Sequence, residues 1–332
     1  MLASEEASNQ NRIAMKIVIL DSYTAVRQDL DWSALEAFGE VIAYDNTPAA
    51  LTVERCKDAE AVLTNKVLLT ADVLAQLPQL KYIGILATGV NSVDCAEATR
   101  RGIIVTNIPA YSTMSVAQLA ISFLLNATSR VDHYAVENRA GKWNSQPHYT
   151  YWDYPFTELA GKQMAIVGFG NIGAAVARIA QALGMKVVAV TSKQQDQLPD
   201  GVVKMPLEEA LATSFAVSLH CPLTPDTRHL MNEKTIGLLR PDAIVINTAR
   251  GPLVDDAAMA AALAQGKLAA YCTDVLAQEP PVGGNPVLDQ PNAFVTPHMG
   301  WTSFEARTRL IATAAANLEA FVKGNPQNVV KQ

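Results

Sequence analysis

Short apolar runs alternate with helical stretches along almost the whole chain. The early runs lie at residues 17–20, 41–44, 61–64, 82–86 and 103–105. The same rhythm restarts at 164–167 and continues at 187–190, 216–219, 243–246 and 270–273, and a further short strand is predicted at 293–295. Runs that are apolar throughout, rather than alternating, indicate parallel strands buried on both faces. The pattern therefore predicts an α/β fold with two doubly wound parallel-sheet domains of the Rossmann or flavodoxin-like type.

Two long helical patterns flank the second set of strands. Residues 115–131 carry apolar side chains at helical spacing, and a second helix covers roughly residues 303–323. They predict hinge helices, because the chain leaves the first domain through one and returns to it through the other. The predicted domains are residues 15–112 together with 303–332, and residues 113–302.

Two segments do not follow this rhythm. Residues 1–14 are polar and lack the apolar core of a signal peptide. Because Met15 directly precedes the first strand, they are interpreted as a disordered leader or as the product of an upstream start. Residues 141–155 are rich in aromatic side chains and have no clear period. Because such a loop is uncommon as a mere linker, it is interpreted as a lid or a subunit contact.

The composition narrows the possible partners. Apolar residues make up 49% of the 332 residues, and the formal net charge of -6 disfavours binding to nucleic acid or to an anionic membrane. No apolar run approaches the length of a membrane span. The four cysteines are dispersed and form no C-x-x-C pair, which predicts reduced thiols in a cytoplasmic protein, and no metal site is predicted.

A glycine-rich turn, Gly168-Phe169-Gly170-Asn171-Ile172-Gly173, follows the strand at 164–167 and opens a helix predicted over residues 171–183. In a G-x-G-x-x-G pattern the glycines allow a tight turn, close approach of the backbone to a pyrophosphate, and close packing of helix on strand. The helix N-terminus offers free N–H groups to the phosphates. A glycine-rich turn without a ligand is the weaker alternative, because the strand and helix context is complete. Residues 113–302 are therefore predicted to bind a dinucleotide.

The next strand lacks the acid that usually binds the ribose of NAD. An Asp or Glu is expected about 20 residues after the first glycine. Here the strand at 186–190 runs into Thr191, Ser192 and Lys193. Two hydroxyls and an ammonium group suit the 2′-phosphate of NADP, but a solvated loop lysine explains Lys193 equally well. The cofactor is therefore predicted to be NAD or NADP, and Thr191 indicates tolerance of NADP.

An arginine, a glutamate and a histidine follow later strands in short distinctive settings. Arg250 lies in Asn-Thr-Ala-Arg-Gly, Glu279 in Ala-Gln-Glu-Pro, and His298 in Thr-Pro-His-Met-Gly. A guanidinium can hold a carboxylate by two charged hydrogen bonds, and a carboxylate beside an imidazole favours the protonated ring that a general acid needs. Taken singly, Arg250 suits a surface ion pair and His298 a structural loop. Together at one predicted sheet edge they indicate hydride exchange at a small 2-keto or 2-hydroxy acid.

With these motifs the chain resembles the D-isomer-specific 2-hydroxyacid dehydrogenases from about residue 15 to the C-terminus. The resemblance implies that Arg250 binds the substrate carboxylate and carbonyl, that His298 protonates the carbonyl oxygen and that Glu279 orients His298. It also implies that residues 15–112 with 303–332 form a substrate-binding domain. The substrate-binding candidates in that domain are Asn65, Ala87, Thr88, Gly89 and Val90.

The resemblance further implies contacts with the cofactor. Thr191 is the departure from the family pattern, because NAD-specific members usually carry Asp there. The implied contacts are Thr113, Gly168, Gly170, Asn171, Ile172, Gly173, Thr191, Ser192, Lys193, His220, Cys221, Pro222, Thr248, Ala249, Arg250, Asp274, His298 and Gly300.

Within the family, Thr64-Asn65-Lys66 and the aromatic loop before Pro155 are most similar to the glycerate dehydrogenase, or hydroxypyruvate reductase, branch. This predicts an NAD(P)-dependent enzyme that reduces hydroxypyruvate or glyoxylate. It also predicts a homodimer in which an aromatic residue closes the partner's active site, and Trp152 is the candidate.

Other activities remain open. D-Lactate, phosphoglycerate or phosphite is the alternative substrate, although a phosphorylated one would need more cations than the scattered Lys66 and Lys81. A cofactor-sensing, corepressor-like interaction protein is the alternative from another class. It is less favoured, because that branch usually carries extra tails whereas this sequence ends shortly after the closing helix.

Overall fold

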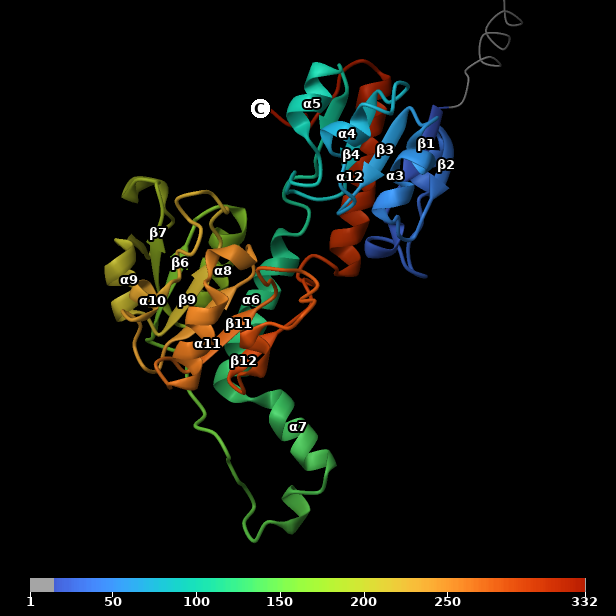
Figure 1. The fold of residues 1–332 in the computed structure, drawn as a ribbon. Helices are drawn as coiled ribbons and strands as arrows, with labels where there is room; N and C mark the ends of the chain where they lie inside the picture. The colour runs from blue at the N-terminus through green and yellow to red at the C-terminus, as the bar shows by residue number, and fades with distance from the viewer. Residues whose placement is uncertain (1–14, 332) are drawn as a thin grey trace, which may run out of the picture. The chain divides into compact units, whose positions relative to one another are not determined.

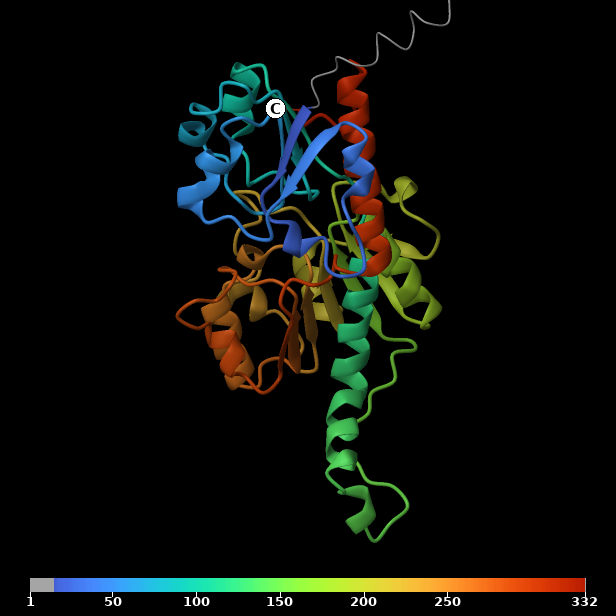
Figure 2. The same ribbon diagram turned by 90° about the vertical axis from the view of Figure 1, so that its right-hand side faces the viewer.

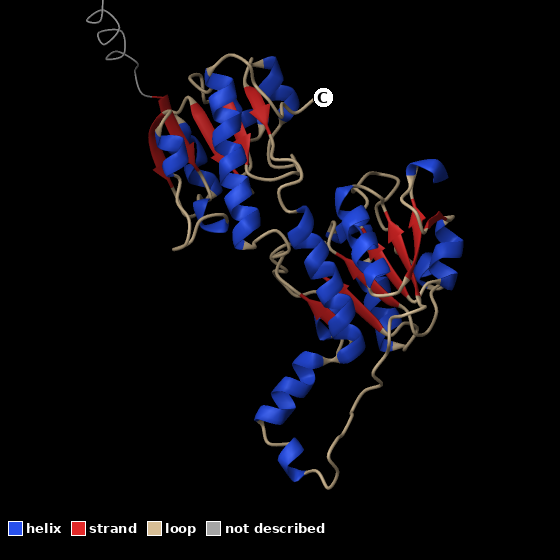
Figure 3. Cartoon of the chain, turned by 180° about the vertical axis from the view of Figure 1, so that it is seen from behind, coloured by secondary structure: helices blue, strands red, loops and turns tan. Residues whose placement is uncertain are grey.

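The computed structural model describes residues 15–331, so the expected leader lies outside the described residues. The chain divides into two compact units. The first unit ends at Tyr111 and resumes at Thr302, and the second unit is the continuous stretch from Ser112 to Trp301. Each unit is a parallel sheet with helices packed on it (Figure 3), which confirms the predicted α/β fold class. No helix of the described residues is long and apolar enough to cross a membrane.

The first unit holds a parallel sheet of five strands in the order β2-β1-β3-β4-β5 (Figure 1), counted over its described residues. The strands are β1 (Met15–Ile19), β2 (Gly39–Ala43), β3 (Ala61–Thr64), β4 (Tyr82–Ile85) and β5 (Ile104–Thr106). The helices are η1 (Ser22–Thr24), α2 (Ser33–Glu36), η2 (Ala49–Leu51), α3 (Thr52–Cys56), α4 (Ala71–Leu74), α5 (Cys95–Arg100) and α12 (Phe304–Val322).

The long helix α12 completes this unit although it comes from the far end of the chain. It lies along the sheet (red in Figure 2), where Phe321 packs against Tyr82 of β4 with 5.0 Å between ring centroids. Ser303 caps the helix, because its Oγ accepts a hydrogen bond from Ala306 N. Beyond the helix, Val330 N donates to Val105 O beside β5. The first sheet therefore depends on residues from both ends of the sequence.

One buried arginine ties the start of α12 to the loop after β1. Arg307 is 7% exposed, and its Nη1 and Nη2 donate to the two carboxylate oxygens of Asp29 at 2.9 and 2.5 Å. Arg307 also donates to the carbonyls of Ala25 and Thr302. The guanidinium therefore has partners for each of its nitrogens and joins two stretches of the chain, residues 25–29 and 302–307.

The second unit holds a parallel sheet of seven strands among its described residues, in the order β12-β11-β10-β9-β6-β7-β8. The strands are β6 (Gln163–Val167), β7 (Lys186–Val190), β8 (Val202–Lys204), β9 (Ala216–Leu219), β10 (Ile244–Asn247), β11 (Ala270–Thr273) and β12 (Ala293–Val295). The helices are α6 (Thr113–Ser129), α7 (Val131–Arg139), η3 (Trp143–Ser145), α8 (Asn171–Ala182), η4 (Gln195–Gln197), α9 (Leu207–Thr213), α10 (Glu233–Ile236), η5 (Gly251–Leu253), α11 (Asp256–Ala264) and η6 (Pro286–Asp289).

Successive residues of the central strands face opposite layers of helices. Met164 and Ile166 of β6 belong to a core with α6 and α8, whereas Ala165 and Val167 belong to a core with α9, α10 and α11. Because both faces are covered, β9, β10 and β11 are buried along their whole length. This explains the continuous apolar runs in the sequence.

The helix expected over residues 115–131 is observed as α6, with both ends two residues earlier in the chain. α6 ends at Ser129, and Arg130 then adopts a left-handed conformation with φ of 51°. The chain turns there into α7, which the sequence pattern did not reveal because none of its residues is buried. In Figures 1 and 2, α7 and the loop after it lead away from the sheet of the second unit as an arm, residues 131–158.

Candidate active site

The strand register of the second unit brings the ends of its strands into line. Val167 pairs with Val190 and Leu219, and the alignment continues from Leu219 to Asn247, Thr273 and Val295. Because the strands are parallel, the residues that follow them emerge at one edge of the sheet. The strand order reverses between β6 and β9, and doubly wound sheets bind ligands at such a switch point.

The glycine-rich turn after β6 has the geometry of a phosphate cradle. Gly168 has φ of 94°, and a side chain there would collide with the backbone of His220 and Cys221. The space over Gly170 is open, since nothing lies within 4 Å of a Cβ built there. The first helical hydrogen bond of α8 runs from Ala174 N to Gly170 O, so the N–H groups before it are available to an anion.

The loop after β7 holds a lysine beside this turn. Lys193 N donates to Thr191 Oγ1 at 3.2 Å, which closes a short turn. The Lys193 ammonium lies 5.7 Å from the centroid of the Phe169 ring, within the range of a cation–π contact. The side chain of Lys193 therefore reaches back toward the glycine-rich turn.

His220 and Thr248 emerge at the same edge from β9 and β10. Burial lowers the pKa of His220 to about 4, so its ring is neutral at pH 7, and Nε2 lies 2.8 Å from Ser218 Oγ. The Thr248 hydroxyl is buried and has no hydrogen-bond partner among the described residues. Because buried hydroxyls nearly always have a partner, a bound dinucleotide would satisfy it. Together with the glycine cradle, this edge fits such a cofactor.

The turn that carries Arg250 is shaped by Asn247, the last residue of β10. The Asn247 side chain donates to Arg250 O at 2.9 Å and accepts from Ala249 N at 3.0 Å. Arg250 itself is exposed, and its Nη1 donates to Ala249 O at 2.7 Å. Sequence reasoning missed Asn247, although an Asn that follows a buried strand and precedes a turn is a usual signal for this kind of bond.

Glu279 and His298 are in direct contact. His298 Nδ1 lies 2.5 Å from Glu279 Oε2, and the two side chains are 27% and 34% exposed. The other carboxylate oxygen of Glu279 accepts from Leu276 N at 3.0 Å. Because Glu279 engages Nδ1, Nε2 is the ring nitrogen that can exchange a proton with a substrate. The structure therefore brings two of the three predicted catalytic residues together, and Arg250 emerges from the same sheet edge.

Asp274 holds the turn around His298. One carboxylate oxygen accepts from Thr296 Oγ1 at 2.5 Å and Met299 N at 2.8 Å, and the other accepts from Gly300 N at 2.8 Å. These bonds lie on both sides of His298, which has φ of 53°. Burial raises the pKa of Asp274, and the hydrogen bonds to Thr296, Gly300 and Met299 oppose that effect. Asp274 was predicted only as a cofactor contact, but here its carboxylate orients the histidine turn.

The first turn of α6 lies against the same segment. Ser115 Oγ donates to Gly300 O at 2.5 Å, and a side chain at Gly300 would approach Leu119 and Asp274. Thr113, a predicted cofactor contact, is the first residue of α6. Ser115 was not among the predicted residues, because a serine near a helix start suggests no more than a cap.

The substrate-binding candidates of the first unit follow β3 and β4. Asn65 is buried, and its N–H donates to the Asp21 carboxylate, which also accepts from the N–H groups of Lys66 and Val67. After β4, Thr88 Oγ1 donates to Ile108 O at 2.8 Å. These contacts hold the backbone of both loops at the carboxyl edge of the sheet. All of these hydrogen bonds join residues of the first unit.

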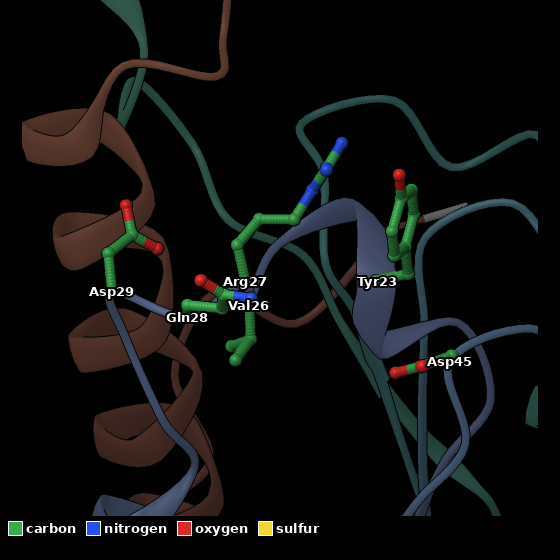
Figure 4. Close-up of a pocket in the computed structure, with 6 residues that line it drawn as sticks. All are labelled: Tyr23, Val26, Arg27, Gln28, Asp29 and Asp45. Atoms are coloured by element: carbon green, nitrogen blue, oxygen red, sulfur yellow. The ribbon is translucent and has the colours of Figure 1, made fainter.

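A separate open pocket of about 630 Å³ lies in the first unit, among the residues that follow β1 and β2 (Figure 4). Arg27 lies over the ring of Tyr23, 3.9 Å from its centroid, and Asp29 points toward α12. The lining residues are Tyr23, Val26, Arg27, Gln28, Asp29 and Asp45. None of them belongs to the predicted site, so this hollow is distinct from the substrate-binding candidates.

Comparisons with known proteins identify the family of the chain. A family model described as D-isomer specific 2-hydroxyacid dehydrogenase, NAD binding domain, matches residues 121–300. A hydroxypyruvate reductase of Blautia hydrogenotrophica is 44% identical over 324 residues, which cover 96% of this chain and all of the relative. The chain belongs to the D-isomer-specific 2-hydroxyacid dehydrogenase family. It is therefore an NAD(P)-dependent oxidoreductase acting on 2-hydroxy acids, as the sequence predicts.

Two further proteins are similar to this chain over almost its whole length. A glycerate dehydrogenase of Methylorubrum extorquens is 41% identical over 95% of this chain and 99% of the relative. Among solved structures, the TT0316 protein of Thermus thermophilus matches with a TM-score of 0.83 and 34% identity, covering 96% of this chain and 100% of that one. The predicted similarity to the hydroxypyruvate reductase and glycerate dehydrogenase branch is thus confirmed.

Proposed function

We propose that this dehydrogenase reduces hydroxypyruvate, and glyoxylate as a smaller alternative, to the corresponding 2-hydroxy acid. The contact of 2.5 Å between His298 and Glu279 carries the chemical part of the proposal. The relatives named hydroxypyruvate reductase and glycerate dehydrogenase, at 44% and 41% identity, support the choice of substrate. The reverse reaction is the oxidation of glycerate, and metabolite levels set the direction.

In this mechanism His298 is the general acid. A reduced nicotinamide, when bound, supplies the hydride. His298 Nε2 donates a proton to the carbonyl oxygen as the alcohol forms, and Glu279 stabilises the protonated ring through Nδ1. The fixed turn at Asp274 orients the imidazole before the substrate arrives, so little motion is needed during the reaction.

Arg250 is proposed to bind the substrate carboxylate. Its guanidinium is exposed at the sheet edge, and a planar fork suits a carboxylate and the adjacent carbonyl. Only Nη1 has a bond within its own turn. The substrate contacts of Asn65 and of the loop at 87–90 stay predictions.

For the cofactor we propose the glycine-rich turn as the pyrophosphate site and the loop after β7 as the site of the ribose. The first N–H groups of α8 and the open space over Gly170 support the former. The position of Lys193 beside Phe169 supports a preference for NADPH, because an ammonium near the ribose attracts a 2′-phosphate. The contacts proposed for Thr113, Thr248 and Asp274 complete this shell.

We further propose that the arm pairs with a second copy of the chain in a homodimer. Within the arm, Tyr134 Oη accepts from the N–H groups of Asp153 and Tyr154, and Asp153 also bonds Lys142 at 2.6 Å, so the arm has a fixed shape. Three of its aromatic side chains are strongly exposed: Tyr149 is 90% exposed, Trp152 74% and Phe156 76%. Such aromatic surface favours an interface. A cytoplasmic location stays a prediction.

The first prediction concerns the proton donor. His298→Asn should keep the fold, because Asn tolerates the positive φ of this residue, but should lower kcat for hydroxypyruvate reduction roughly 10²–10⁴-fold. Cofactor Kd, measured by fluorescence, should stay unchanged. His229→Asn, at a residue with φ of 50° outside the site, is the matched control. Near-native turnover of the His298 variant would exclude the proposed donor.

Glu279→Gln belongs to the same test, because it removes a charge and keeps the shape. Its loss in kcat should be smaller, roughly 10- to 100-fold, which is the usual weight of a charged hydrogen bond. Reduction takes up a proton from His298, so its rate should fall at high pH. Without the carboxylate that stabilises a protonated ring, the fall should begin at lower pH. The pH profile of kcat measures this shift.

The second prediction concerns the substrate and Arg250. Steady-state rates on a panel of 2-keto acids should give a higher kcat/KM for hydroxypyruvate than for pyruvate. Arg250→Lys should raise KM at least about tenfold and lower kcat, because a lysine loses the two-point grip. Arg240→Lys, at an exposed arginine bonded to Asp242, is the control and should behave as the native enzyme. An unchanged KM in Arg250→Lys would show that Arg250 does not bind the substrate carboxylate.

The third prediction concerns the choice between the two cofactors. The native enzyme should use NADPH at least as well as NADH. Thr191→Asp should lower the ratio of kcat/KM for NADPH over NADH by roughly 10- to 100-fold, since a carboxylate repels the 2′-phosphate. An Asp can still accept the hydrogen bond from Lys193 N, so the turn is retained. Thr191→Asn has the same shape without the charge and should change the ratio far less. A strong native preference for NADH would contradict the proposal.

The fourth prediction concerns the arm. Replacing Trp152 and Phe156 together by Ser should convert the particle from twice the chain mass of 35.6 kDa to a single chain, because it removes two large and strongly exposed apolar side chains of the arm. Sedimentation velocity at micromolar concentration measures the mass. Tyr23→Ser, at a residue 51% exposed in the first unit, should leave it unchanged. A dimer that survives the double replacement would show that the arm is not the interface.

A further inference from the structure

Glu279 lies on a loop with little burial to hold it. Residues 277–280 and 282–284 are exposed, and the stretch contains two prolines and the pair Gly283 and Gly284, both with positive φ. The internal bonds of this loop are short-range, such as Val282 N to Pro280 O and Gly284 N to Pro281 O. Bonds of that kind shape the loop but do not fix its position on the unit. The position of Glu279 therefore depends on how the two ends of the loop are anchored.

Both ends are bonded to the same carboxylate oxygen of Asp256. Oδ2 of Asp256 accepts from Asn285 Nδ2 at 2.6 Å and from Ala277 N at 3.3 Å. Asp256 is the first residue of α11, but it does not cap the helix. The neighbouring Asp255 does so, with Oδ1 accepting from the N–H groups of Ala257 and Ala258. The two adjacent carboxylates thus have different tasks, one in the helix and one in the loop.

A close backbone contact transmits this anchoring to the catalytic side chains. Gly251 packs so tightly against the backbone of Leu276 that any side chain at 251 would collide with it. Leu276 N in turn donates to Glu279 Oε1, and Glu279 Oε2 contacts His298. The turn of Arg250, the anchored loop and the histidine are therefore joined in one continuous chain of contacts.

From this arrangement we infer that Asp256 is a positioning residue for the acid–base pair. It fixes the loop at 277 and at 285, so that the Glu279 carboxylate meets Nδ1 of His298. This inference rests on the proposed function, because it concerns the efficiency of that same pair. In this role Asp256 acts through Glu279, because its carboxylate bonds the two ends of the loop that carries it. Its other oxygen, Oδ1, is buried and without a hydrogen-bond partner among the described residues, so its effect comes from the two bonds at Oδ2.

The test compares three substitutions at neighbouring residues in the full-length enzyme with cofactor. Asp256→Ala should lower kcat for hydroxypyruvate reduction about 10- to 100-fold, since a displacement of about 1 Å is enough for such a loss. It should also move the fall in rate to lower pH, as Glu279→Gln does, while cofactor Kd stays unchanged. Asp256→Asn retains an acceptor oxygen and should restore most of kcat. Asp255→Asn removes a charge one residue away, keeps the helix cap and should match the native profile.

A second variant approaches the anchor from its other side. Asn285→Asp keeps the oxygen that accepts from Val287 N but places a carboxylate against Asp256. Asn285→Asp should show the same change in pH profile as Asp256→Ala. If Asp256→Ala does not fold, Asn285→Asp alone tests the inference. A native pH profile in Asn285→Asp and Asp256→Ala would overturn the inference, as would an Asp256→Asn variant as impaired as Asp256→Ala. If Glu279→Gln itself behaved as the native enzyme, the proposed function would fail instead.

Discussion

Parallel pairing with an unbroken register is the constraint on which the second unit depends. Because Val167, Leu219, Asn247, Thr273 and Val295 are aligned across neighbouring strands, each connecting loop begins at the same height. Residues that are far apart in sequence are thus brought to the same edge of the sheet by strand pairing alone. A slip of one residue in a single strand would turn its buried side chains to the other face, and the packed cores on both faces oppose it.

Carboxylates that accept backbone N–H groups give the loops their final shape. Asp21 holds the loop after β3, and Asp274 holds the turn around His298. A carboxylate can accept several hydrogen bonds at once, and charged acceptors form the stronger ones. Both residues follow the ends of strands, where the chain must leave regular pairing and its N–H groups need new partners. The geometry of the candidate site is therefore set in part by residues to which no chemical step is assigned.

The sequence predicts the architecture well, because burial on two faces leaves a direct trace in the apolar runs. The exception among the strands is β8, which the pattern does not reveal since only Val202 of its three residues is buried. The break at Arg130 is equally invisible, because an arginine in a left-handed conformation carries no sequence signature of its own. Local patterns thus succeed where packing is uniform and fail at edges and turns.

The site is predictable in part for a different reason. Arg250, Glu279 and His298 stand in distinctive short motifs, and the register explains why they share an edge. The task of Asp274 is not predictable, because an acid after a strand looks the same whether it faces a ligand or a backbone turn. The positions of Ser115 and Asn247 follow from hydrogen bonds that join their side chains to main-chain groups. Such bonds depend on loop conformation, which periodicity does not encode.

The discontinuity of the first unit has a consequence for synthesis on the ribosome. Its first segment ends at Tyr111, yet α12, whose Phe321 packs on Tyr82, begins only at Phe304. At the usual rates of translation, the intervening stretch takes roughly 10 to 40 s to be made. During that time the nascent sheet lacks α12, the long helix that packs on β4, whereas the second unit is complete as soon as Trp301 has emerged. The unit that is encoded first is thus the last one able to finish folding.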